Sequence, residues 1–297
     1  MPGHSHSHAY TGKRVFWVAL LKIFITLAEA VGGIISGSLA LLSDAVHNLS
    51  DTAAVVLSYI ANKIAGRAKD AKMTYGYKRA EILAAFINSA VLLGISLVLL
   101  FEAYRRLRAP EVIDGTLMIT VALVGLVADF FSVFLLQKDA HKSLNIKASY
   151  LHLVSDTISS VGVLAGGIAI KLWGVVWVDP LVTVLIALYI VKATMEIIRK
   201  TVNILMQSAP PLDYEAIKAG ILAIDKVKNI HHVHSWMIDE KTIYFEAHID
   251  VDDMLLSEVE KIYDRIEKHL KGRYGISHVT LQAEVDRCCD KDICETS

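Results

Sequence analysis

The chain has 297 residues, 54% of them hydrophobic, and a mean hydropathy of +0.46. Ordinary soluble proteins contain about 45–50% apolar residues, so this composition excludes an ordinary soluble enzyme and indicates a membrane protein. The formal net charge of −1 gives no electrostatic reason to expect a nucleic acid as partner.

Six long apolar segments dominate the first two thirds of the chain. Each of them reaches the roughly 20 residues that a membrane-spanning helix needs. They cover residues 16–35, 39–64, 82–104, 115–137, 146–172 and 175–198. We therefore expect residues 13–208 to form an all-α bundle of six transmembrane helices in the lipid bilayer.

The two ends of the chain carry metal-binding residue types. Residues 1–12 form an arm with histidines on alternate positions, His4, His6 and His8. This arm is either an unstructured terminus or a weak site that gathers metal near the pore entrance. The cysteines all lie within residues 288–297, which predicts a reduced tail, either solvated or metal-binding, and not a disulfide framework.

Lysine and arginine residues in the connections predict the orientation. One side of the membrane receives thirteen: Lys13, Arg14, Lys63, Arg67, Lys69, Lys72, Lys78, Arg79, Lys138, Lys142, Lys147, Arg199 and Lys200. The other side receives four: Arg105, Arg106, Arg108 and Lys171. Both termini are therefore expected in the cytoplasm, and the compact loops favour a bacterial inner (plasma) membrane.

Two apolar segments contain the same His-x-x-x-Asp pattern. His47 and Asp51 lie in the second segment, and His152 and Asp156 lie in the fifth. Residues four apart share one face of a helix, and ionisable residues inside a membrane mark functional sites. Two facing helices would thus bring two imidazoles and two carboxylates together, a ligand set that suits tetrahedral zinc.

The two patterns belong to a longer internal repeat. At the constant offset of 105 residues that separates His47 from His152, the neighbouring serines, leucine and threonine also recur. The second and fifth segments are separated by two helices, so they run in opposite directions across the membrane. This is the inverted-repeat arrangement of secondary transporters, whose substrate sites lie near the bilayer midplane.

Other ionisable residues interrupt the apolar segments. We expect Glu29 and Asp129 to pair with Lys22 or with hydroxyl groups inside the bundle, with a role in proton passage as the alternative. Asp44 is either a carboxylate of an outer vestibule or a residue at the start of a helix. None of the three is a predicted metal ligand.

The composition after Pro210 and Pro211 is that of a soluble domain. Periodicity predicts an α-β-β-α-β order with helices at 213–224 and 255–270 and strands at 228–238, 241–251 and 277–285. This order fits a small ferredoxin-like α+β domain over residues 209–287. Its core is modest, so dimerisation through it would add stability.

The histidines of this domain cluster on its predicted strands. On a regular strand, His232 and His234 share one face while His231 points to the other. Convergence of these histidines with His248 and Glu284 predicts a cytoplasmic zinc site; surface or edge histidines are the alternative.

Four stretches of the chain are similar to one known family. They are GSLALLSDAVHNLSD (37–51), YGYKRAE (75–81), ASYLHLVSD (148–156) and HHVHSW (231–236). In this order they resemble the second, third and fifth spans and the cytoplasmic domain of the cation diffusion facilitators, the zinc-efflux transporter family. The resemblance covers nearly the whole chain.

The resemblance implies a homodimeric proton/metal antiporter. The His-Asp/His-Asp quartet is similar to that of the zinc-type members, whereas manganese- and iron-type members carry Asp in place of these histidines. Some bacterial relatives hold a second metal with an Asp and two His in the loop between spans two and three. That loop contains no histidine in this chain, so we expect Asp70 to be a solvated charge.

The expected mechanism follows from the ligands. Zn²⁺ is the substrate and a candidate ligand of the cytoplasmic domain, and no cofactor is expected. Zn²⁺ enters from the cytoplasm, binds the quartet and leaves outward as H⁺ replaces it. Cysteine ligands would favour Cd²⁺ or Cu(I), and the spans contain none, which argues for Zn²⁺; Co²⁺ and Cd²⁺ are the further candidates. A membrane zinc hydrolase and a tethered zinc sensor are the competing classes.

Overall fold

The computed structural model describes residues 6–137, 144–285 and 287. The side chains of the first helix are described from Leu20 onward. The chain divides into two compact units, Met1–Tyr59 with Ala84–Ile198 and Ile60–Leu83 with Arg199–Ser297.

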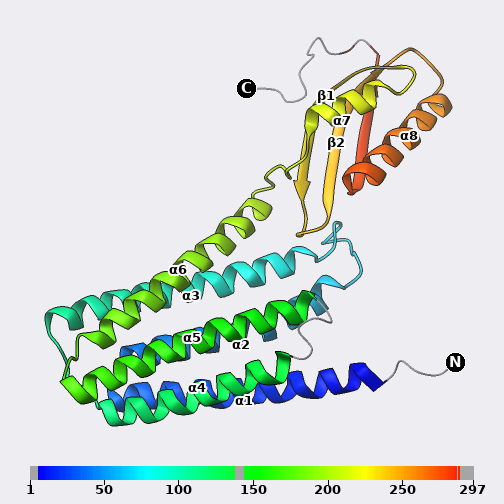
Figure 1. The fold of residues 1–297 in the computed structure, drawn as a ribbon. Helices are drawn as coiled ribbons and strands as arrows, with labels where there is room; N and C mark the ends of the chain where they lie inside the picture. Colours follow the sequence, from blue (N-terminus) through cyan, green and yellow to red (C-terminus); the bar gives the residue numbers. More distant parts are fainter. Residues whose placement is uncertain (1–5, 138–143, 286, 288–297) are drawn as a thin grey trace. The chain divides into compact units, whose positions relative to one another are not determined.

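Six long helices form in the order predicted from the apolar segments (Figure 1). They are α1 (His6–Ser36), α2 (Leu39–Ala65), α3 (Arg79–Arg108), α4 (Gly115–Gln137), α5 (Leu144–Trp173) and α6 (Val178–Leu205). α1 begins before the apolar segment, so part of the expected N-terminal arm is helical. Apolar runs mark what lipid can cover and do not mark where backbone hydrogen bonding ends.

Four helices are long and apolar enough to cross a membrane within the described residues. They are α3, α4, α6 and the part of α5 from His152 to Trp173. α2 is of similar length but carries Asp44, His47 and Asp51 inside its apolar run. The polar residues that lower its hydropathy are thus the ones that suggested a site.

Close helix packing in the first unit depends on glycine. A Cβ added to Gly32 of α1 would lie 2.6 Å from a side-chain carbon of Val121 on α4. A Cβ added to Gly125 of α4 would lie 2.7 Å from a carboxylate oxygen of Glu29 on α1. Small residues let helices approach closely where lipid provides no hydrophobic drive, so these two positions set the spacing of α1 and α4.

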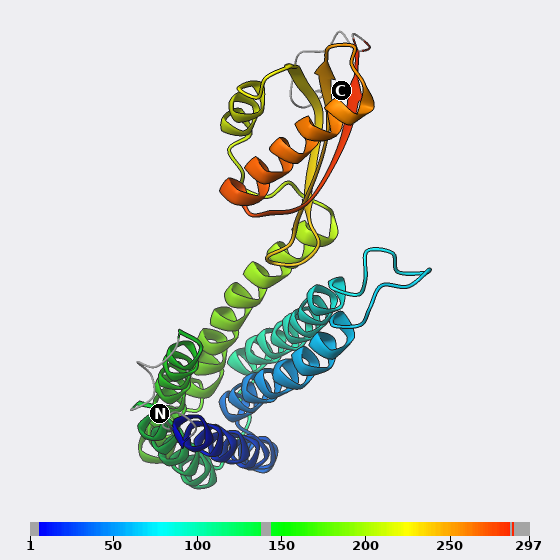
Figure 2. The same ribbon diagram turned by 90° about the vertical axis from the view of Figure 1, so that its right-hand side faces the viewer.

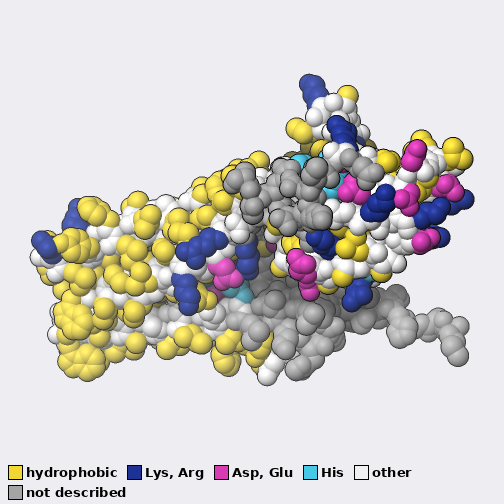
Figure 3. Space-filling view, turned by 90° about the horizontal axis from the view of Figure 1, so that it is seen from above, with side chains coloured by type: hydrophobic (Ala, Val, Ile, Leu, Met, Phe, Trp, Pro, Cys, Tyr) yellow, Lys and Arg dark blue, Asp and Glu magenta, His cyan; other side chains and the backbone are white. Residues whose placement is uncertain are grey.

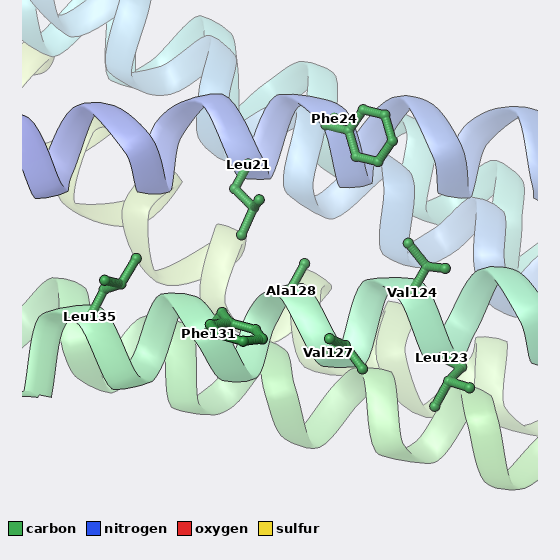
Figure 4. Close-up of a pocket in the computed structure, with 8 residues that line it drawn as sticks. All are labelled: Leu21, Phe24, Leu123, Val124, Val127, Ala128, Phe131 and Leu135. Atoms are coloured by element: carbon green, nitrogen blue, oxygen red, sulfur yellow. The ribbon is translucent and has the colours of Figure 1, made fainter.

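The outer surface of the helices is apolar. Figure 3 shows hydrophobic side chains over most of the helical part, with a few small groups of charged side chains among them. A groove of about 630 Å³ lies between α1 and α4. It is lined, as Figure 4 shows, by Leu21, Phe24, Leu123, Val124, Val127, Ala128, Phe131 and Leu135. With no polar side chain among them, the groove offers no ligand to an ion.

The C-terminal domain has the predicted α-β-β-α-β order. Its elements are α7 (Tyr214–Leu222), β1 (Val227–Met237), β2 (Ile243–Val251), α8 (Leu256–Tyr274) and β3 (Ile276–Glu284). The sheet has the order β1-β2-β3, with β1 antiparallel and β3 parallel to β2. Both helices cover one face of the sheet (Figure 2). The predicted two-layer α+β domain is confirmed.

α8 shows how this domain builds its core. Val259, Ile262, Ile266 and Leu270 are buried at helical spacing and face the sheet. The helix ends at Gly275, whose φ of 68° is left-handed and whose N–H donates to the carbonyl of Leu270. Glycine adopts this conformation without the cost of a Cβ, so the chain can turn directly into β3.

Strand β1 departs from regular alternation at its histidines. His231 pairs with His248, but the next paired residue is His234, opposite Glu246. The extra residue forms a bulge at His232, which has a φ of 52°. The expectation that His231 points away from its neighbours is wrong, because the bulge lets the rings of His231 and His232 both lie beside His248.

Candidate metal sites

The first candidate site lies between α2 and α5. Each helix places an imidazole and a carboxylate one turn apart on one face, His47 with Asp51 and His152 with Asp156. The four ligand atoms lie within 4.8 Å of one another. The structure therefore brings together all four residues predicted from the repeated pattern.

The pairs within this quartet cross between the helices. His152 Nε2 lies 2.9 Å from Asp51 Oδ2, and His47 Nε2 lies 3.7 Å from Asp156 Oδ1. Within each helix, the distance between imidazole nitrogen and carboxylate oxygen is 3.6 Å for His47 and Asp51 on α2 and 3.8 Å for His152 and Asp156 on α5. A tetrahedral zinc with bonds near 2.05 Å needs ligand atoms about 3.3 Å apart, so the 2.9 Å pair would open slightly and the wider pairs, which reach up to 4.8 Å, would close.

The quartet is buried on one side and open on the other. The Asp156 side chain is 2% exposed and that of His47 17%, whereas Asp51 and His152 are 37% and 46% exposed. Asp156 Oδ1 and His47 Nδ1 are buried without a hydrogen-bond partner. Because unpaired buried polar atoms are costly, the deep side of the quartet is chemically suited to a cation that enters from the open side.

A polar network surrounds the deep side of the quartet. Lys22 Nζ on α1 lies 2.6 Å from Asp156 Oδ2 and 3.0 Å from Asp129 Oδ1. Asp129 also accepts a hydrogen bond from Ser160 at 2.8 Å, and Glu29 accepts one from Asn48 at 3.0 Å. The expected pairing of Asp129 with Lys22 and a hydroxyl group is confirmed, whereas Glu29 pairs with an amide.

Asp44 lies inside α2 and not at its start. Its side chain is buried and accepts a hydrogen bond from Ser159 of α5 at 3.1 Å. The reading of Asp44 as a helix-start residue is therefore wrong. The residue that performs this role is Asp179 of α6.

Asp179 anchors the first turn of α2. Its carboxylate accepts hydrogen bonds from the Ser38 hydroxyl at 2.5 Å and from the backbone N–H groups of Leu39 and Ala40 at 2.9 and 3.2 Å. These groups would otherwise lack partners at a helix N-terminus. This contact, which fixes the helix that carries His47, was not predicted, because capping from a distant helix leaves no local sequence signal.

The second candidate site lies on the sheet of the C-terminal domain. His231 Nε2 lies 3.4 Å from Glu284 Oε2, and His248 Nδ1 lies 3.1 Å from Glu284 Oε1. Both ring nitrogens of His231 and one Glu284 oxygen are buried without a hydrogen-bond partner. These three residues therefore form a second group with metal-ligand geometry.

His232 and His234 lie outside this second group. Their Nε2 atoms are 3.3 Å apart, and the His232 ring lies beside that of His248 with centroids 4.7 Å apart. The predicted five-residue cluster therefore separates into three ligand candidates and two neighbours.

The loop between α2 and α3 contains Asp70, which is exposed. It is more than a solvated charge, because the Tyr77 hydroxyl and the backbone N–H groups of Lys72 and Met73 donate to it. The hydrogen bond from Tyr77 is the largest cause of a lowered pKa for this carboxyl. Asp70 thus organises the loop.

Several predicted residues lie outside the described part of the chain. They are His4, the side chains of His6 and His8, and the tail cysteines Cys288, Cys289 and Cys294.

A membrane bundle with a His–Asp quartet between two helices defines a class of metal-cation transporters, and comparison with known proteins gives the family. The model of the cation efflux transmembrane domain matches residues 15–206, and that of the cation efflux protein cytoplasmic domain matches residues 209–286. The chain belongs to the cation efflux family. It is therefore a multi-pass membrane transporter and not an enzyme.

Named relatives cover nearly the whole chain. The metal cation efflux system protein CzcD of Cupriavidus metallidurans is 37% identical over 98% of this chain and 92% of its own length. The cadmium, cobalt and zinc/H(+)-K(+) antiporter of Bacillus subtilis is 36% identical over 96% and 92%. The zinc transporter ZitB of Escherichia coli is 33% identical over 97% and 95%.

Proposed function

We propose that this protein exports Zn²⁺ from the cytoplasm in exchange for protons, with Cd²⁺ and Co²⁺ as further substrates. The metal binds tetrahedrally to His47, Asp51, His152 and Asp156. The observation that carries this proposal is the convergence of these four ligand atoms, within 4.8 Å, from two helices of an inverted repeat. The names of the Escherichia coli and Bacillus subtilis relatives agree with this choice of metals.

Among these metals, the donor set favours Zn²⁺ and Co²⁺. Imidazole nitrogen and carboxylate oxygen suit Zn²⁺ and Co²⁺, whereas Cu(I) prefers soft sulfur ligands. The three cysteines of the chain are all in the C-terminal tail. Two ionised carboxylates also neutralise a divalent cation in a medium of low dielectric constant.

The same ligands support exchange with protons. A proton and a metal ion compete for the lone pairs of imidazole and carboxylate, so binding of one releases the other. The quartet changes its protonation as a coupled set. Alternating access then lets the site load metal from the cytoplasm and exchange it for protons on the outer side, and an inward proton gradient drives export.

The arrangement of the chain in the cell is part of the proposal. Both termini lie in the cytoplasm of a bacterial inner membrane, residues 13–208 form the transport domain, and residues 209–287 form a cytoplasmic domain. We propose that this domain joins two copies into a homodimer. The match of residues 209–286 to a cytoplasmic-domain model supports this assignment.

We further propose that the cytoplasmic domain binds its own Zn²⁺ through His231, His248 and Glu284. Three protein ligands leave a fourth tetrahedral position for water or another donor. The buried ring nitrogens of His231, which have no hydrogen-bond partner, support this assignment. Zinc there would regulate transport or stabilise the domain.

Reconstituted protein in proteoliposomes tests the transport proposal. A zinc-sensitive dye and a pH-sensitive dye report zinc movement and proton counter-movement under a set pH gradient. We expect His152→Ala and Asp51→Ala to lose both signals. His278→Ala is the matched control, because His278 is an exposed imidazole of β3 outside both groups. Undiminished zinc-coupled proton flux in His152→Ala or Asp51→Ala would overturn the proposal.

A further inference from the structure

Lys22 places an ammonium group beside the transport site. Its side chain is 14% exposed, and its Nζ lies 2.6 Å from Asp156, 3.0 Å from Asp129 and 3.2 Å from Asn48 Oδ1. A charged group inside a membrane domain is costly unless it is paired. It donates hydrogen bonds to Asp156 and Asn48 and forms an ion pair with Asp129, and one of these three partners, Asp156, is a proposed metal ligand.

The other two partners of Lys22 are held in place independently of Asp156. The Ser160 hydroxyl donates to Asp129 Oδ2 at 2.8 Å. The Asn48 amide nitrogen donates to Glu29 at 3.0 Å, which turns the Asn48 oxygen toward Lys22. Lys22 therefore keeps Asp129 as an anionic partner and Asn48 as a neutral partner when Asp156 binds another cation.

We propose, on the basis of the transport function above, that Lys22 is a tethered counter-cation of the transport site. It neutralises Asp156 when the quartet holds no metal, and it passes to Asp129 and Asn48 when Zn²⁺ takes Asp156. The charges agree with this exchange. Two carboxylates of the quartet balance the bound dication, and Asp129 balances Lys22.

This role has two consequences for transport. The ammonium competes with the metal for Asp156, so it weakens metal binding and favours release. It also compensates a buried carboxylate while the empty carrier returns, which lowers the cost of that step. Net export needs the return of the carrier without metal, whereas exchange of zinc for zinc does not.

Two variants shift the metal affinity in opposite directions. The double variant Lys22→Met/Asp129→Asn removes the competing cation together with its second partner, and we expect its zinc Kd to fall about tenfold or more. Asp129→Asn alone leaves Lys22 with Asp156 as its only anion, and we expect its zinc Kd to rise about tenfold. Isothermal titration with Zn²⁺ in detergent measures both values.

Transport assays separate this role from a merely structural one. Isotopic zinc in proteoliposomes gives zinc/zinc exchange with metal on both sides and net export with metal on one side. We expect the ratio of exchange to net export to rise severalfold in the double variant. Lys22→Arg keeps the charge and is expected to shift the ratio less than the double variant does.

The outcomes distinguish this inference from the function on which it rests. Wild-type protein without zinc flux would overturn the transport proposal itself. If the wild type exports zinc but Asp129→Asn and the double variant keep its zinc Kd, or shift it in the same direction, the role of Lys22 is overturned. Equal loss of exchange and net export would also overturn it. If the double variant does not fold, Asp129→Asn and Lys22→Arg still decide.

Discussion

The membrane quartet and the cytoplasmic group deliver similar ligands by different backbone geometry. In the quartet, two helices each supply an imidazole and a carboxylate one turn apart. In the cytoplasmic group, three strands supply one ligand each: His231, His248 and Glu284. A helix pair can change its tilt and so open or close a site, whereas a hydrogen-bonded sheet holds its ligands at fixed spacing. The difference fits a site that must release its metal and one that can retain it.

The surroundings of the two sites differ in charge. The quartet has the ammonium of Lys22 against Asp156 at 2.6 Å. Among the described residues, the lysine or arginine that pairs with Glu284 is Arg287, whose exposed guanidinium lies 4.0 Å away. An internal cation that competes for a ligand is therefore a property of the membrane site. This contrast suggests weaker, exchangeable binding there and tighter binding in the sheet.

The largest expected effect comes from removing a ligand in each region. We expect His47→Ala to lower zinc export at least about 100-fold, because even outer partners of a metal site are worth about 10–100-fold in affinity or activity. His248→Ala should retain most of the export. Zinc flux into inverted membrane vesicles measures both. Equal loss in the two variants would show that the sites do not differ in role.

Removal of the contact that anchors α2 comes next. Asp179→Ala leaves two backbone N–H groups and the Ser38 hydroxyl without their acceptor, which should cost about 2 kcal/mol of stability. Thermal unfolding in detergent measures this loss, and titration should show weaker zinc binding at the quartet alone. Asp179→Asn keeps an oxygen acceptor and should lose less. An unchanged unfolding temperature in Asp179→Ala would contradict the anchoring role.

A third test concerns metal that stays bound. We expect Glu284→Gln to lower the tightly bound zinc by one ion per chain, measured by elemental analysis after dialysis. A ligand that binds only the folded state stabilises it by about 2.7 kcal/mol at 100 times its Kd. Zinc should therefore raise the unfolding temperature of the wild-type domain more than that of the variant. Glu246→Gln, on the same strand as His248 but outside the group, is the control.

The smallest expected effect is a pH dependence in the cytoplasmic domain. Partial burial disfavours the charged form of Asp239 and so tends to raise its pKa. The N–H groups of Lys241 and Thr242 and the Thr242 hydroxyl donate hydrogen bonds to the carboxylate, and these outweigh the burial, so the pKa of Asp239 is lowered. A lowered folded pKa means that the ionised carboxylate stabilises the turn at neutral pH. This stability is lost as the pH falls through the folded pKa.

Amide hydrogen exchange across the β1–β2 turn measures this effect. Protection of the Thr242 N–H should decrease on acidification below the ordinary Asp range, and Asp239→Asn should remove the pH dependence. Protection that is lost already well above that range would contradict the lowered pKa. The membrane quartet shares no residue with this turn.

Much of the fold could be predicted from the sequence, because apolar length and periodicity are local properties. The six long helices and the α-β-β-α-β order both follow from them. The quartet could also be found, since His47 and Asp51 recur as His152 and Asp156 in helices. The spacing of two residues in one segment is enough to predict that they share a face.

Contacts between distant segments could not be predicted in this way. Asp179 caps a helix that begins 140 residues earlier in the chain, and its own segment carries no sign of that role. The bulge at His232 depends on how β1 pairs with β2, so strict alternation failed there. The contact of Lys22 with Asp156 depends on how α4 packs against both α1 and α5, although an isolated lysine in an apolar segment was a signal that it needed a partner.

Gly125 has an effect that extends over three helices. The space where a side chain would begin on α4 is occupied by the carboxylate of Glu29 from α1. That carboxylate orients the amide of Asn48 on α2, whose oxygen faces Lys22. The absence of one methyl group on α4 thus helps to determine the orientation of an amide on α2, and an alanine at this position would act on the transport site without touching any of its ligands.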